Sequence, residues 1–175
     1  TIAVALAVGV SASGFGIGLS GAGANATNII NNQVHAFIKD SGTVKAVNAI
    51  SVTATNPSTI TALVGAAAAA GGGGAGGGGA GAIGVSLARN LIGYTEYGFS
   101  TPLQNEVLAY ISGSSLTAKT GDITINAKAT ERVATDAFAG SVAIAGGAIA
   151  GSAAGAGVEV TNQLATKIVA YADAS

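Results

Sequence analysis

Three short segments of the sequence read alike: QVHAFI at residues 33–38, EVLAYI at 106–111 and KIVAYA at 167–172. An Ala followed by an aromatic residue marks the phase of each copy, at Ala36, Ala109 and Ala170. Self-similarity at a nearly fixed spacing is typical of repeat architectures. The sequence therefore predicts one structural module that occurs three times.

The recurrent Asn residues that precede these segments reveal an insertion in the middle copy. Ala109 and Ala170 are 61 residues apart, whereas Ala36 and Ala109 are 73 apart. An Asn precedes the marker Ala by 8 residues in the two outer copies but by 19 residues in the middle copy. The middle copy therefore carries 11 additional residues (19 − 8).

The outer copies align without a gap over 41 positions, residues 1–41 against 135–175. Copy three ends before the alternating segment that follows the marker in the other two. Either the chain is a stretch of a longer array, or a neighbouring subunit supplies the missing strand by strand addition. We expect one continuous structural unit that consists of repeat 1 at 1–60, repeat 2 at 61–134 with an insertion at about 92–106, and an incomplete repeat 3 at 135–175.

Alternation of side-chain type predicts β-strands. Residues 123–129 (ITINAKA) alternate apolar and polar residues, as a half-buried strand does. Residues 137–145 (AFAGSVAIA) place large apolar residues on one face and Ala, Gly and Ser on the other, which permits close packing on the small face. A helix over residues 71–81 would lose about 1 kcal/mol per Gly, so this stretch is either a close-packed extended segment or a flexible loop.

These patterns predict an all-β fold, built from repeats and stacked like a β-solenoid. The alternative is a sandwich of long antiparallel strands with a close-packed interface rich in Ala and Gly.

Composition excludes several classes of function. Only 9% of residues are charged and the net charge is −1, so no electrostatic footprint for nucleic acid exists. With no Cys and one His, His35, neither a zinc site nor a catalytic triad is expected. The GIGLSG motif at residues 16–21 lacks the helix that a dinucleotide site requires. We predict no enzymatic activity, no catalytic residue, no cofactor and no metal, with structural calcium at a turn such as Asp122 kept open.

Two sets of residues are candidate sites. The insertion gathers aromatic residues that form either a cover for a neighbouring hydrophobic face or a contact surface for a subunit or ligand. Its residues are Tyr94, Tyr97, Phe99 and Pro102. The recurrent Asn28, Asn90 and Asn162 predict a turn or an Asn ladder between stacked copies.

The unit resembles the repeats of very large secreted bacterial adhesins of the filamentous-haemagglutinin-like type. Those repeats join Ala/Gly-rich alternating runs to an Asn followed by a Val-x-Ala-Tyr-Ile segment, and to Gly-Asp-Ile-x-Ile-x-Ala segments. The corresponding residues here are Asn28 with 34–38, then 107–111, then 121–127. The resemblance implies a secreted, rod-like protein of the bacterial cell surface with stacked β structure.

We therefore expect an extracellular structural and adhesive protein that is part of a cell-surface adhesin or a self-assembling filament. Its expected partners are further copies, joined as a homo-oligomer or polymer through strand edges, and a host or neighbouring-cell surface. An outer-membrane β-barrel fragment is the alternative, because residues 1–34, 56–88 and 137–158 carry no charge over membrane-spanning length.

Overall fold

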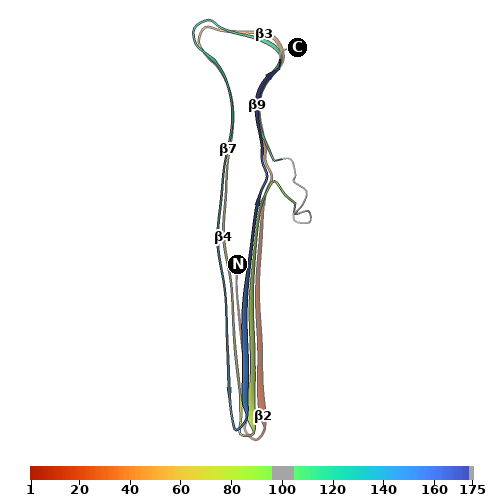
Figure 1. Ribbon diagram of the computed structural model, residues 1–175, viewed down its shortest axis with the longest axis vertical. Coiled ribbons are helices and arrows are strands. Elements are labelled where there is room, and N and C mark those ends of the chain that lie inside the picture. Colours follow the sequence, from red (N-terminus) through yellow and green to blue (C-terminus); the bar gives the residue numbers. More distant parts are fainter. Residues whose placement is uncertain (96–104, 174–175) are drawn as a thin grey trace. The chain divides into compact units, whose positions relative to one another are not determined.

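The computed structural model describes residues 1–95 and 105–173, which form nine β-strands and no helix (Figure 1). The strands are β1 (Ile2–Ser11), β2 (Phe15–Ile30), β3 (Gln33–Ala46), β4 (Ile50–Gly74), β5 (Gly77–Ile92), β6 (Glu106–Ala118), β7 (Ile123–Gly146), β8 (Ala150–Leu164) and β9 (Lys167–Asp173). The expected all-β fold is confirmed. Those residues include no helix that is long and apolar enough to cross a membrane.

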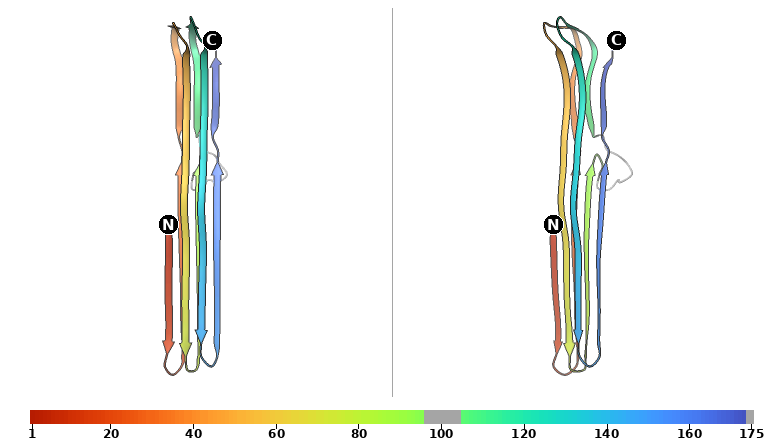
Figure 2. Two further views of the ribbon diagram at one scale, coloured as in Figure 1. Left: turned by 90° about the vertical axis from the view of Figure 1, so that its left-hand side faces the viewer. Right: turned by 60° about the vertical axis from the view of Figure 1, so that its left-hand side comes forward.

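Strands that are three apart along the chain are hydrogen-bonded neighbours. The three sheets have the strand orders β1-β4-β7, β2-β5-β8 and β3-β6-β9. The pairs are parallel, and Figure 2 shows β1, β4 and β7 side by side with their arrowheads pointing the same way. The alternative with antiparallel strands is therefore wrong. A parallel pair needs a crossover connection, and here the two intervening strands supply it.

The three marker segments lie at equivalent positions in sheet β3-β6-β9. Ala36 pairs with Ala109, and Ala109 pairs with Ala170. The insertion falls between the end of β5 and the start of β6, so it leaves the register of both strands unchanged. Similar sequence therefore corresponds to the same place in the sheet.

Two compact units make up the chain. Unit 1 comprises Thr1–Asn28, Thr61–Arg89 and Ala134–Thr161, and unit 2 comprises Ile29–Ile60, Asn90–Val133 and Asn162–Ser175. Each unit takes one segment from each expected repeat, and the expected repeat boundaries fall inside β4 and β7. A strand such as β4 thus contributes residues 50–60 to one unit and 61–74 to the other.

The interior of unit 1 consists mostly of Gly and Ala, and Val64 and Ser86 are also fully buried there. A Cβ atom added at Gly72 would lie 1.8 Å from the carbonyl oxygen of Gly79, and one added at Gly18 would lie 2.1 Å from that of Gly71. Only a residue without a side chain fits between backbones this close. Further along the strands the interior side chains are those of Ala68, Ala70, Ala80 and Ala82. Most of residues 71–81, left open by the sequence, is therefore close-packed extended chain, since β4 ends at Gly74 and β5 begins at Gly77.

The interior of unit 2 contains larger aliphatic side chains. Val52, Val107 and Ile111 are buried there together with Ala54 and Ala109. Partly buried residues of the flanking strands pack against this cluster, namely Val34, Ala36, Ile38, Leu116, Ile125, Ala127 and Ala129. This core fixes which face of sheet β3-β6-β9 points inward.

Candidate interaction surface

The outer face of sheet β3-β6-β9 carries aromatic and charged side chains in columns. Val34, Ala36 and Ile38 pack against the interior of unit 2, so the residues between them point outward. Because the strands are parallel and in register, equivalent outward positions of β3, β6 and β9 line up across the sheet. The columns are 33/106/167, 35/108/169, 37/110/171 and 39/112/173.

Three aromatic rings form one of these columns, and we call Phe37, Tyr110 and Tyr171 the aromatic ladder. The ring centroids of Phe37 and Tyr110 are 5.3 Å apart with planes 15° from parallel, and those of Tyr110 and Tyr171 are 5.1 Å apart at 4°. The middle ring therefore has a neighbour on each face, while each outer ring has one face that the ladder leaves uncovered. Phe37 is 56% exposed and Tyr171 is 41% exposed.

A charged pair, Glu106 and Lys167, lies in the column 33/106/167, four residues from the rings of the ladder. The carboxylate of Glu106 accepts a hydrogen bond from Lys167 Nζ at 3.2 Å and lies 3.6 Å from His35 Nε2. Glu106 is buried, whereas the Lys167 side chain is exposed. The pair therefore ties β6 to β9 and leaves a cation at the outer edge of the sheet.

A hydrogen-bonded network lies where the chain enters the third sheet. Asn105 Oδ1 accepts a hydrogen bond from the backbone N–H of Asn32 at 2.7 Å. Asn105 Nδ2 donates to Thr166 Oγ1 at 2.6 Å and to Glu131 Oε1 at 3.2 Å, and the Thr166 hydroxyl also donates to Glu131. Asn105 is 1% exposed, so these bonds satisfy polar groups that would otherwise be costly to bury. The network positions the backbone where β3, β6 and β9 begin.

The recurrent Asn residues lie inside strands rather than in turns. Asn28, Asn90 and Asn162 belong to β2, β5 and β8, which are adjacent strands of one sheet. In unit 2, Asn90 Nδ2 donates a hydrogen bond to Asn162 Oδ1 at 2.8 Å. The turn alternative is therefore wrong for these residues, and the Asn90–Asn162 bond has the geometry of a side-chain ladder.

The other predicted site falls largely outside the described residues. Tyr94 lies just after β5 and is partly buried, whereas Tyr97, Phe99 and Pro102 are among residues 96–104, which the structure does not describe. Asp122 lies directly before β7, and its backbone carbonyl accepts a hydrogen bond from the N–H of Ile50. Within the described ranges no three His, Asp or Glu side chains gather as a metal site.

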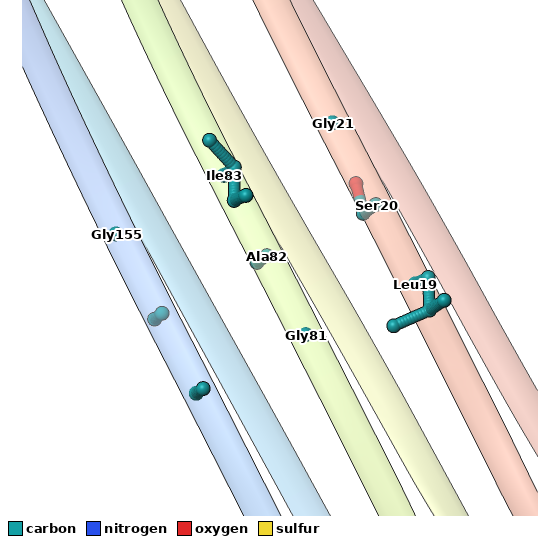
Figure 3. A pocket seen from close by; sticks show the side chains of 9 residues that line it. Leu19, Ser20, Gly21, Gly81, Ala82, Ile83 and Gly155 are labelled. Carbon is teal, nitrogen blue, oxygen red and sulfur yellow. The ribbon is translucent and has the colours of Figure 1, made fainter.

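Unit 1 has shallow apolar grooves on its outer faces. The groove in Figure 3 has a volume of 540 Å³, and Leu19 and Ile83 rise beside a floor that includes Gly21, Gly81 and Gly155. A groove of 400 Å³ on sheet β1-β4-β7 is similar, with Val4, Leu6 and Val142 around Ala67 and Ala69. Neither lining contains a charged residue. These surfaces suit packing against apolar material.

Sequence reasoning missed the aromatic ladder as a surface and the network around Asn105. The signal for the ladder was present, because strand alternation puts an aromatic residue on the face opposite the Ala before it. No match was found when the chain was compared with protein-family models, curated proteins and solved structures.

Proposed function

We propose that this chain is an extracellular structural and adhesive protein, part of a cell-surface adhesin or self-assembling filament, with a β-solenoid fold. In this proposal β1–β3, β4–β6 and β7–β9 are successive coils. The observation that carries it is the in-register parallel pairing of strands three apart, which brings Ala36, Ala109 and Ala170 into one line. A chain that winds in one direction with three strands per turn brings each strand beside the strand three positions earlier, parallel to it.

A stacked coil suits a structural role. Each coil contacts only its neighbours, so length is gained by adding coils without redesigning a core. The backbone hydrogen bonds between β3, β6 and β9 and the stacked rings of the aromatic ladder all act along the stacking direction. These features support a structural function that depends on the length of the protein.

The adhesive role draws support from the outer face of sheet β3-β6-β9. Exposed aromatic rings flanked by His35, Glu106 and Lys167 combine apolar area with directional polar groups, as recognition surfaces do. Repetition presents equivalent residues at each coil, which creates an extended contact surface. The extracellular location rests on the resemblance of the repeats to those of secreted adhesins.

A bead assay tests the adhesive function. Beads that carry the purified chain should attach to cultured cells several-fold more than beads that carry the Phe37→Ser/Tyr171→Ser variant. The matched control is Phe15→Ser, which removes an exposed aromatic ring from unit 1 and should leave attachment unchanged. Electron microscopy of the same preparations should show elongated particles.

Localisation needs a separate measurement. An antibody against the chain should stain unpermeabilised cells of the source organism as strongly as permeabilised ones. Attachment no greater than that of uncoated beads, or staining confined to permeabilised cells, would contradict the proposal.

A further inference from the structure

The two outer edges of sheet β3-β6-β9 are compatible with each other. Among the described strands, β3 and β9 each have a neighbour only on the side of β6. The other edge of each strand presents backbone N–H and C=O groups to which a further strand can bond. Since β9 corresponds to β3 in sequence, its open edge resembles the edge that β3 presents to β6.

The aromatic ladder ends in an uncovered ring face at both edges. Among the rings of residues 1–95 and 105–173, Phe37 of β3 stacks on Tyr110 alone, and so does Tyr171 of β9. The spacings of 5.3 and 5.1 Å are close to the separation between paired strands. A strand added at the correct register would therefore place a fourth ring on the ladder without any change in its geometry.

The charges at the two edges are complementary in that register. Lys39 pairs with Ser112, and Ser112 pairs with Asp173, so a basic and an acidic residue occupy opposite ends of one column. Lys39 Nζ lies 4.0 Å from the carboxylate of its neighbour Asp40, and the Lys39 side chain is half exposed. If β3 of another chain followed β9, its Lys39 would face Asp173.

We propose that a second copy of this chain docks on β9 through its own β3, parallel and with Ala36 opposite Ala170. The contact adds Phe37 of the second copy to Tyr171 and pairs its Lys39 with Asp173. The two surfaces that meet are different, so the contact is heterologous and each added copy exposes the same open edge again. The inference rests on the filament in the proposed function and specifies its contact.

A charge swap tests this contact in the full chain. Asp173→Lys sets Lys against Lys39, and Lys39→Asp sets Asp against Asp173, so each variant alone should associate at least roughly tenfold more weakly than the unmodified chain. Mixing the two variants restores an opposite pair at every contact, and the mixture should associate like the unmodified chain. The measurement is sedimentation velocity over a concentration series.

Lys45→Asp is the matched control, because Lys45 lies on β3 opposite Thr117, outside the segment that pairs with β9. It should leave association unchanged. Circular dichroism confirms that each variant retains its strands. If the single swaps associate normally, or their mixture does not recover, the proposed contact is wrong. Bead adhesion of the immobilised chain does not require the contact, so failure here is distinguishable from failure of the proposed function.

Discussion

Unit 1 and unit 2 place the same kinds of side chain on opposite faces. Val4 in unit 1 is 77% exposed and points away from an interior of Gly and Ala. Val107 in unit 2 is completely buried, and the aromatic and charged side chains point outward there. In both units the strands are extended and successive side chains alternate between the two faces of the sheet. The local structure is therefore the same, and the units differ in which face is buried.

The difference shows that side-chain size, and not hydrophobicity, selects the buried face where the glycine backbones of unit 1 meet, whereas Val64 is buried elsewhere in the same unit. Both faces of its strands are apolar, so the free energy of removing side chains from water does not strongly favour burial of either face. Sheets usually pack about 10 Å apart because side chains fill the space between them. Around Gly72 and Gly79 the backbones are too close for even a methyl group. Large apolar residues can then occupy only the outer face.

Truncation of an Ile to Ala should give the largest difference between the units in the free energy of unfolding. Ile111→Ala in unit 2 removes a side chain that is 6% exposed and should lower the free energy of unfolding by about 3 kcal/mol. Ile17→Ala in unit 1 makes the same chemical change at a side chain that is 67% exposed, and should lower it by about 0.5 kcal/mol or less. Denaturant unfolding of dilute protein measures both. Equal losses would break the comparison.

Enlargement of a Gly should have an intermediate effect, confined to the interior of unit 1. Gly72→Ala forces two backbones apart and should cost about 2 kcal/mol. Gly23→Ala is the control, since a Cβ there meets nothing within 4 Å, and it should be neutral or slightly stabilising. Thermal unfolding followed by circular dichroism reports both values. A tolerated Gly72→Ala would mean that the two sheets can separate without loss.

A charge on the outer face of unit 1 should have the smallest effect on stability. Val4→Lys should change the free energy of unfolding by less than about 0.5 kcal/mol, because the site is solvated. It should nevertheless reduce the fluorescence of a dye that binds apolar surface, such as ANS. Thr53→Lys, at an exposed position of unit 2, is the control for added charge and should leave dye binding unchanged. A strongly destabilised Val4→Lys would show that this face is buried.

Much of the fold could be predicted from the sequence, and the reason is repetition. The segments around Ala36, Ala109 and Ala170 indicate equivalent positions, and the structure pairs them directly. Parallel pairing could not be predicted from the sequence pattern, because side chains alternate between the two faces in parallel and antiparallel strands alike. The state of residues 71–81 depends on how close a distant strand approaches, which no local pattern of Gly residues encodes.

The candidate surface was predicted less well. The aromatic residues of the three markers set the phase of the repeat, whereas the predicted contact surface was the insertion, where Tyr94 is the one predicted site residue that the structure describes. The network around Asn105 joins residues far apart in sequence, Asn32, Glu131 and Thr166, two of which precede strands. Such a network appears only once the segments that precede β3, β6 and β9 are placed side by side in space.

Parallel pairing between strands three apart has a consequence for how the chain acquires its structure. Ile2 pairs with Gly65 and Glu106 with Lys167, so the sheets contain no local hairpin that can form early. The first hydrogen-bonded strand pairs must close loops of at least 61 residues, and this entropy is lost before any hydrogen bond between strands compensates for it. Such high contact order makes initiation slow. After the first two strands of each sheet have paired, the third strand meets a finished edge, so growth on an existing template is faster than its nucleation.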